Sequence, residues 1–253
     1  MAGHSHAANI KFRKGRVDAA RGKLFSKLAR EIISAAREGG GDPAGNLRLR
    51  YAIDRAKAAS MPRDNIERAI KRGTGELQGD SLEDLLYEGY GPGGVAFLVE
   101  ALTDNRNRTA PEVRKTFEKR GGKMAATGAV AWMFERRAIF VVEREGAPGE
   151  EDMLEFVLEI GGDDLLVEAE AFEIRGAPSD FKTIAEGIEG KGLKAVEAGL
   201  AWIPKQTVSV EDREKASQIL KLIEALEDLE DVRAVSANYD IPGDLLAELQ
   251  EGD

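Results

Sequence analysis

The sequence predicts an α+β protein in which an N-terminal three-helix bundle precedes two ferredoxin-like α/β domains, one inserted into the other. Two observations carry this prediction. Up to Gly73 the apolar residues recur with helical spacing, and from Tyr87 they follow the period of two that β-strands have. Beyond Ala138 the segments follow the order β-α-β-β-α-β, which is the split βαβ arrangement. A chain of 253 residues is long enough for two or three such domains.

Three segments account for the helical part. Residues 16–37 place apolar side chains on one stripe of a helix and Lys or Arg on a separate stripe. A second helix is expected from an Asn46 cap to Ala59, and a third from Pro62 to Gly73. The residues expected to face inward are Val17, Leu24, Phe25, Leu28, Ile32, Ala35, Leu49, Ala52, Ile53, Ala56, Ile66, Ala69 and Ile70.

The α/β part is predicted from alternating strands and helices. The first series is a strand at 94–103, a helix starting at a Thr109–Glu112 capping box, and a strand at 129–135. The second comprises strands at 138–144, 165–175 (broken near Ala169) and 198–204, with helices at 150–160 and 179–190. A strand at 206–210, a helix at 211–228 and a strand at 232–240 complete the first series. The predicted domains are therefore residues 1–79, residues 80–136 with 207–253, and the inserted residues 137–206.

Charge is distributed unevenly along the chain. Residues 1–79 hold 17 Lys or Arg against 8 Asp or Glu, whereas residues 80–253 hold 19 against 38, so +9 and −19 give the net −10. Such asymmetry indicates a nucleic-acid-binding region joined to an acidic body. The cations expected to contact nucleic acid at the N-terminus are Lys11, Arg13, Lys14, Arg16, Arg21, Lys23, Lys27 and Arg30. The alternative is a solvated helix face, and carboxylates that neutralise these side chains within the fold would contradict the hypothesis.

Two further motifs allow two interpretations each. In "TDNRNRT", Arg106 and Arg108 precede a helix start and could hold a phosphate, or they could pair with acids of the body. The glycines of "EGYGPGG" could admit a partner's backbone, although a tight turn before a strand is commoner. This motif matches neither the P-loop nor the dinucleotide fingerprint.

Composition restricts the function classes. The absence of cysteine excludes a disulfide scaffold, a thiolate zinc site and a Cys nucleophile. His4 and His6 are the only histidines and lack a third ligand, so we expect no metal, no cofactor, no small-molecule substrate and no enzymatic activity. The apolar stretches are too short to span a bilayer, and we expect a cytoplasmic protein without membrane contact. An Arg-rich organellar transit peptide remains an alternative for residues 1–30.

Several blocks of the sequence resemble the YebC family when they are taken in order. They are "MAGHSHAANIKFRKGRVDAARGKLFSKLAREI", "GGGDP", "NLRLRYAIDRAKAASMPRDNIERAIKRGTGEL", "YEGYGPGG", "LTDNRNRT" and, more loosely, "NYDIP". The family includes probable transcriptional regulators and the mitochondrial translational activator of cytochrome c oxidase. The resemblance implies a helical domain and two α/β domains, one inserted into the other. His6, Ala7 and Phe12 stand where the family commonly has Lys, Trp and His.

These observations predict a non-catalytic regulator of gene expression whose basic N-terminal domain holds the phosphate backbone. A DNA-binding transcriptional regulator is the first interpretation. A ribosome-associated translation factor that binds RNA fits the same residues, as does an adaptor whose acidic face docks on a basic protein. No recognition-helix pair or RNP aromatic signature is found, which favours binding by shape and charge over sequence readout.

Overall fold

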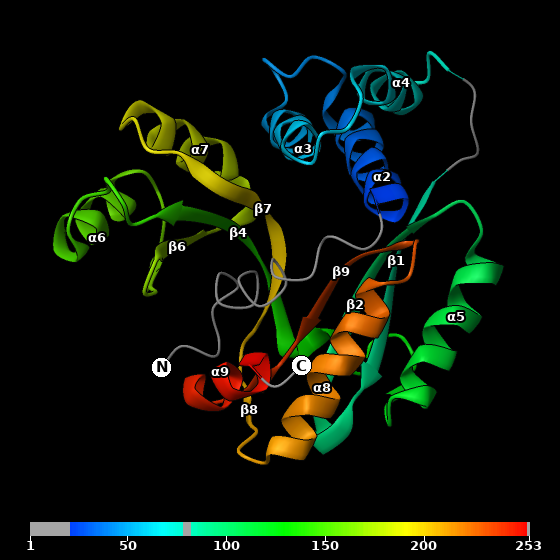
Figure 1. Ribbon diagram of the computed structural model, residues 1–253. Helices are drawn as coiled ribbons and strands as arrows, with labels where there is room; N and C mark the ends of the chain where they lie inside the picture. Colours follow the sequence, from blue (N-terminus) through cyan, green and yellow to red (C-terminus); the bar gives the residue numbers. More distant parts are fainter. Residues whose placement is uncertain (1–20, 78–81, 252–253) are drawn as a thin grey trace. The chain divides into compact units, whose positions relative to one another are not determined.

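The computed structural model describes residues 21–77 and 82–251. The chain divides into two compact units. The first unit contains the described residues from Arg21 to Met133 together with Asp212–Tyr239, and the second contains Phe134–Glu211 and the described C-terminal segment from Asp240. N-terminal helices followed by sheets with packed helices confirm the predicted α+β class (Figure 1).

Three helices open the first unit: α2 (Arg21–Gly39), α3 (Leu47–Ala58) and α4 (Arg63–Gly73). The side chain of Asn46 caps α3 as predicted, since its oxygen accepts from the amide of Leu49 at 3.1 Å. Its amide nitrogen donates to the carbonyls of Ala35 and Gly40, both at 2.8 Å, so one side chain ties the end of α2 to the start of α3.

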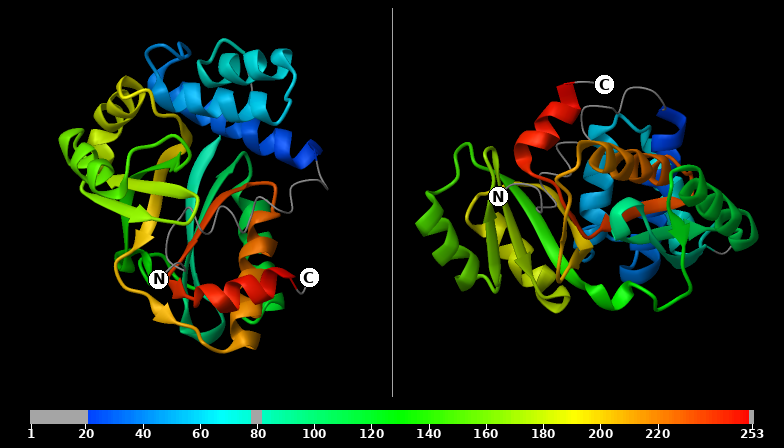
Figure 2. Two further views of the ribbon diagram at one scale, coloured as in Figure 1. Left: turned by 60° about the vertical axis from the view of Figure 1, so that its left-hand side comes forward. Right: turned by 90° about the horizontal axis from the view of Figure 1, so that it is seen from below.

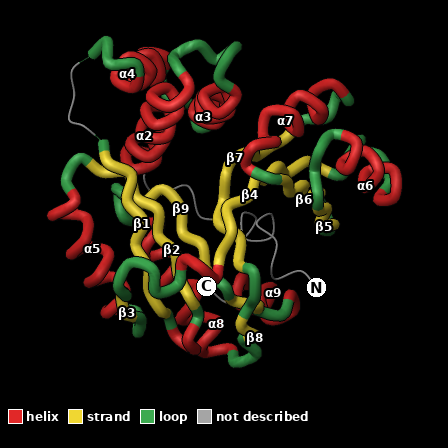
Figure 3. The backbone as a smooth tube through the Cα atoms, turned by 180° about the vertical axis from the view of Figure 1, so that it is seen from behind, coloured by secondary structure: helices red, strands yellow, loops and turns green. Residues whose placement is uncertain are grey.

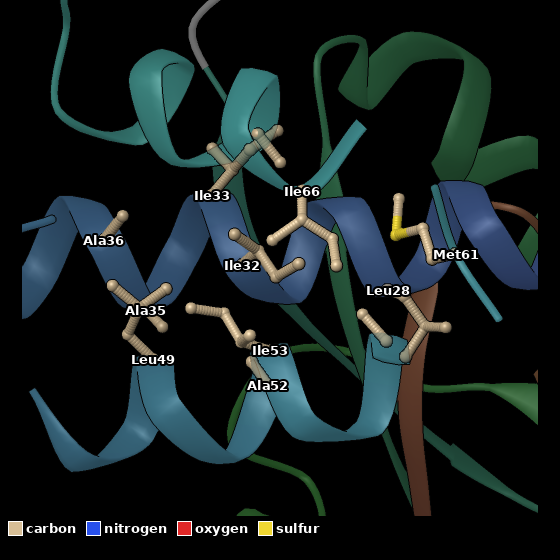
Figure 4. Packing of buried hydrophobic residues seen from close by; sticks show 12 residues of the cluster. Leu28, Ile32, Ile33, Ala35, Ala36, Leu49, Ala52, Ile53, Met61 and Ile66 are labelled. Carbon is tan, nitrogen blue, oxygen red and sulfur yellow. The ribbon is translucent and has the colours of Figure 1, made fainter. Parts of the chain in front are cut away.

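The bundle core follows the predicted stripes. Residues of α2 such as Ile32 and Ala35 face Leu49 and Ile53 of α3 (Figure 4). Gly73 lets α4 approach α2 closely, because a Cβ there would lie 2.6 Å from both the Cβ of Ala36 and the carbonyl of Ile33. The buried set is Leu28, Ile32, Ile33, Ala35, Ala36, Leu49, Ala52, Ile53, Ala56, Met61, Ile66 and Ala69.

The sheet of the first unit has the order β3-β1-β2-β9. Its strands are β1 (Glu83–Tyr90), β2 (Ala96–Thr103), β3 (Lys123–Met124) and β9 (Val232–Ala237). Helices α5 (Arg106–Lys119) and α8 (Arg213–Glu227) pack on it (Figure 3). Phe97 of β2 and Phe117 of α5 meet edge to face, with ring centroids 5.9 Å apart. Strand β1, which the sequence analysis missed, precedes β2 as a hairpin partner, so the chain order is β-β-α-β-α-β.

The second unit contains the predicted β-α-β-β-α-β series (Figure 2). Its elements are β4 (Phe134–Glu143), α6 (Glu150–Glu159), β5 (Asp164–Val167), β6 (Ala171–Gly176), α7 (Phe181–Gly190) and β7 (Ala195–Pro204). The strand order β5-β6-β4-β7, antiparallel throughout, is that of a ferredoxin-like sheet. The short strands β8 (Val208–Ser209) and β10 (Tyr239–Asp240) pair separately, and α9 (Gly243–Glu251) ends the described chain.

Two predicted boundaries were wrong. The strand expected at 129–135 is a 3₁₀ turn over Ala131–Met133, and β4 runs without a break from Phe134 to Glu143, so the two strands expected on either side of Arg136 are one. Within the described residues, no helix combines the length and apolar character needed to cross a bilayer.

Candidate nucleic-acid interface

The structure describes only part of the predicted basic stripe. Four of its cations lie outside the described residues: Lys11, Arg13, Lys14 and Arg16. Val17, predicted to face inward, also lies outside them. Arg21 and Lys23 occupy the first turn of α2, where the backbone alone is described. Their role in binding therefore stays a prediction.

The remaining cations of the α2 stripe contact the α/β part of the first unit. The amino group of Lys27 donates to the carbonyl of Glu227, at the end of α8. Arg30 forms ion pairs with Glu230 at 3.2 Å and with Asp231 at 3.0 Å. Lys27 and Arg30, which were predicted to contact an external polyanion, therefore also hold α2 against the turn between α8 and β9.

Arg37, at the end of the same face, makes a similar contact. Its guanidinium pairs with Asp84 of β1 at 2.6 Å and donates to the carbonyl of Leu82. Asp84 in turn lies 3.5 Å from Arg233, which pairs with Glu100 at 2.8 Å. Carboxylates thus neutralise Arg30 and Arg37 in part. This goes against the binding hypothesis at Arg30, which belongs to the predicted set; Arg37 does not.

Asp231 is the centre of the contact that Arg30 makes. Its side chain is 1% exposed and accepts hydrogen bonds from the hydroxyls of Thr103 at 3.0 Å and Thr109 at 2.6 Å. Arg108 pairs with it at 2.7 Å. Burial alone would raise the pKa of Asp231, but the hydrogen bonds from Thr109, Arg108 and Thr103 and the charge of Arg30 outweigh it and lower the pKa. The carboxylate is therefore charged at neutral pH.

The two arginines of "TDNRNRT" lie in the first turn of α5. Asn105 caps this helix by accepting from the amides of Asn107 and Arg108, so the predicted Thr109–Glu112 capping box was wrong and the helix begins three residues earlier. Arg108 pairs with Asp231 and Asp104, the second of the two interpretations of this motif. Arg106 is exposed and forms no ion pair with any described residue.

Two groups of exposed cations were not predicted as groups. In residues 106–123 only Arg106 and Arg108 were named, because the charge was averaged over long segments, and the cations of α4 were not singled out within the basic N-terminal part. Residues 106–123 hold 7 Lys or Arg against 2 Asp or Glu, although they belong to the part that is acidic as a whole. The exposed members without an ion pair to any described residue are Arg106, Arg114, Lys115, Lys119, Arg120 and Lys123 on and after α5, and Arg68, Lys71 and Arg72 on α4. A window of about twenty residues would have found the group at residues 106–123.

The glycine motif is a tight turn before a strand. Gly93 and Gly94 have positive φ angles of 72° and 76°, and Gly91 packs so closely that a Cβ would lie 2.4 Å from the ring of Phe97. A side chain at these positions would be strained or would clash. His4 and His6 lie outside the described residues, and the described residues contain no group of three or more His, Cys, Asp or Glu that could hold a metal ion.

Cation-rich N-terminal helices followed by two four-stranded antiparallel sheets define an α+β protein whose charge is segregated along the chain. The chain belongs to the TACO1/YebC family. Residues 5–76 match the TACO1/YebC protein N-terminal domain, and residues 82–239 match the TACO1/YebC second and third domain. The resemblance found in the sequence is thereby confirmed.

Relatives match this chain over nearly its whole length and their own. A protein of Pelotomaculum thermopropionicum is 50% identical over 95% of this chain and 99% of its own, and one of Halothermothrix orenii is 50% identical over 99% and 100%. Both are named probable transcriptional regulatory proteins. The crystal structure of a conserved hypothetical protein from Aquifex aeolicus is 49% identical, has a TM-score of 0.84, and matches over 94% of this chain and 98% of that one.

Proposed function

We propose that this protein is a non-catalytic regulator of gene expression that binds nucleic acid through its basic N-terminal part, with DNA as the first ligand to test. The segregation of charge carries the proposal: residues 21–77 hold 13 Lys or Arg against 7 Asp or Glu, whereas residues 134–211 hold 8 against 18. The names of the relatives support a regulatory role. Each phosphate that a cation neutralises releases counterions, which supplies sequence-independent affinity.

The cations proposed to meet phosphate directly are those without a described internal partner. They comprise the cations from Lys11 to Lys23, Arg68, Lys71 and Arg72 of α4, and Arg106. Lys27, Arg30 and Arg108 contact other parts of the first unit, so their proposed contribution is to fix the position of α2 and α5 and to raise the local potential. The acidic second unit would repel nucleic acid from its own surface and thereby restrict binding to the cationic one.

Charge reversal tests this proposal. Lys11→Glu with Lys14→Glu and, separately, Arg68→Glu with Lys71→Glu should weaken binding of a fluorescent 24-base-pair duplex measured by anisotropy. Between 50 and 200 mM salt, the negative slope of log affinity against log salt should become shallower by about 0.9 for each phosphate that is no longer neutralised. Lys27 and Arg30 are left intact because their replacement would also loosen α2.

The matched control reverses two exposed cations of the second unit, Lys182→Glu with Lys194→Glu. It changes the net charge by the same amount and should leave the salt slope unchanged. Equal losses for the control and the test variants would mean that net charge alone matters, and unchanged binding in both test variants would refute the proposed surface.

A translation factor that contacts ribosomal RNA is the alternative for the same surface. Crosslinking in cells followed by sequencing separates the two ligands, since reads over promoters support transcription and reads over ribosomal RNA support translation. Co-sedimentation with ribosomes gives an independent measurement. The charge-reversal variants belong in both experiments, because a true contact must lose its crosslinks when the cations are reversed.

An adaptor role would use helix α6 of the second unit. Leu154 and Leu158 are exposed one helical turn apart, and acidic side chains surround them. Such a face suits a partner that is apolar at its centre and basic at its rim. Leu158→Glu should abolish that docking and leave nucleic-acid binding intact, so the two roles can be told apart with one variant each.

A further inference from the structure

Two exposed aromatic side chains converge at one end of the first unit's sheet. Tyr90 is the last residue of β1, and Trp132 lies in the 3₁₀ turn before Phe134. The Tyr90 hydroxyl donates to the carbonyl of Ala129 at 3.3 Å, and the Trp132 indole N–H donates to the same carbonyl at 3.1 Å. The two residues are 38% and 66% exposed. Because the one polar atom of the Trp132 side chain donates to Ala129, the exposed surface of this side chain is the carbon surface of the ring.

A buried carboxylate holds the segment that presents Trp132. Glu88, 2% exposed, accepts backbone hydrogen bonds from Gly128, from Val130 at 2.7 Å and from Ala131 at 2.9 Å. Burial alone would raise the pKa of Glu88, but these backbone hydrogen bonds outweigh it and lower the pKa, so the group stays charged. Trp132 is therefore displayed on a turn fixed by three charge-assisted hydrogen bonds, which is the preorganisation that a binding surface needs.

Positive charge borders this aromatic pair. Lys123 of β3 is directly opposite Tyr90 of β1 in the antiparallel register, so their side chains lie on the same face with Cβ atoms about 5 Å apart. Lys119 ends α5 and Arg120 follows it. All three cations are exposed, and none forms an ion pair within the described part of the chain. Apolar rings beside a cation match a nucleotide, whose base is a flat ring and whose phosphate is an anion.

We propose that Tyr90, Trp132 and Lys123 form a platform on which an unpaired base of a nucleic-acid strand stacks, with its flanking phosphates against Lys123, Lys119 and Arg120. This inference rests on the proposed nucleic-acid binding and adds a preference for single-stranded segments. In a duplex the base faces are covered by their neighbours, so a duplex can use the cations and not the rings. The cationic border favours this ligand over an apolar protein surface.

Trp132 itself reports on the platform. The chain has two tryptophans, so Trp202→Phe leaves Trp132 as the sole indole emitter. In this background we expect dT12 and rU12 to quench the emission on binding, and a 12-base-pair duplex to quench it much less at equal occupancy. Occupancy is measured separately by anisotropy of a label on the oligonucleotide, and comparison of dT12 with rU12 distinguishes DNA from RNA as the source of the base.

Substitution gives a second measurement. Trp132→Leu should weaken binding of dT12 or rU12 roughly 5- to 150-fold, the range of base–aromatic stacking, and change duplex binding less than twofold. Trp132→Phe should recover part of the loss, because a smaller ring still stacks. Trp202→Phe is the matched control and should bind like the wild type. Far-UV circular dichroism and thermal melting verify that each variant is folded.

The outcomes separate the two proposals. If oligonucleotides bind without quenching and Trp132→Leu binds single strands normally, the platform is refuted while nucleic-acid binding stands. If Trp132→Leu weakens single strands and duplex equally, the ring supports the fold and the stacking proposal is refuted. If the wild type binds no oligonucleotide at low salt, the proposed function fails, and the platform with it.

Discussion

Replacing Asp231 by Asn tests the contact on which the first unit is built. The substitution keeps the shape of the side chain but removes its charge. It also places an NH₂ group, which donates, where a carboxylate oxygen accepted hydrogen bonds. Asp231 is 1% exposed and receives hydrogen bonds from two threonine hydroxyls and ion pairs from Arg108 and Arg30. We therefore expect a folded protein in which two guanidiniums no longer have their buried counter-ion.

The expected loss of unfolding free energy depends on how exposed Arg108 and Arg30 are. Removing one member of a buried ion pair costs about 3–5 kcal/mol because the other charge stays buried and unpaired. Arg108 is 43% exposed and can be hydrated again, whereas Arg30 is 17% exposed and can be hydrated only in part. The lower end, about 3 kcal/mol, is therefore expected for Asp231→Asn at pH 7. At about 2–4 °C per kcal/mol, the melting temperature should fall by roughly 6–12 °C.

The stabilisation that Asp231 provides should decrease in acid. The pKa of Asp231 is lower in the folded protein than its ordinary value of 3.8, so its stabilisation is complete above that value and is lost as the pH falls through the folded pKa. The difference in melting temperature between wild type and Asp231→Asn should thus be constant from pH 7 to pH 5. The difference should narrow below about pH 4, because the unfolded wild type then binds a proton at Asp231 that the folded protein does not bind until its lower pKa is reached.

Thermal melting monitored by Trp132 emission in the Trp202→Phe background follows the first unit specifically, since Trp202 belongs to the second. Asp228→Asn is the matched control: this acid is exposed on the same turn and pairs with no described residue. It should melt within about 1 °C of the parent. An Asp231→Asn protein that melts like the parent at pH 7, or whose deficit does not narrow in acid, would refute the reasoning.

Three smaller perturbations test other contacts. Glu88→Gln should cost about 1–3 kcal/mol by weakening three backbone hydrogen bonds, and should lower the steady-state anisotropy of Trp132 emission as the turn loosens. Asn46→Ala should cost about 1–3 kcal/mol, measured by urea unfolding, because it removes the α3 cap and two further hydrogen bonds. Gly73→Ala should destabilise by about 1–3 kcal/mol in the same assay, since its Cβ would overlap Ala36; unchanged stability would mean that α4 can shift freely.

The helices and the second unit could be predicted because their signals are local. The cap at Asn46 and the buried spacing of Leu49, Ala52, Ile53 and Ala56 need only a few neighbouring residues. Strand β1 was missed because most of its side chains are exposed or half-buried, so its alternation is weak. Strand β4 was divided in two because its paired arginines at 136 and 137 interrupt an otherwise apolar run.

The partners of the basic stripe could not be predicted, because they are remote in the sequence. Arg30 and Asp231 are about two hundred residues apart, and only the pairing of β9 beside β2 brings the acid to α2. A helical wheel shows which side chains share a face and does not show what covers that face. By contrast, the cluster of cations at residues 106–123 can be recognised from the local sequence. Averaging the charge over residues 80–253, which are acidic as a whole, concealed it.

The contact between Arg30 and Asp231 also bears on which cations a polyanion can use. Transferring Arg30 to a phosphate would leave Asp231 buried with one counter-ion fewer, and such a loss costs several kcal/mol. A phosphate meets no such cost at Arg68 or Lys71, which are exposed and have no ion pair among the described residues. Arg30→Ala should therefore lower stability while the affinity of the folded fraction changes little, and Arg68→Glu with Lys71→Glu should do the reverse. Because one variant changes mainly stability and the other mainly affinity, the pair distinguishes a cation that builds the surface from one that meets the ligand.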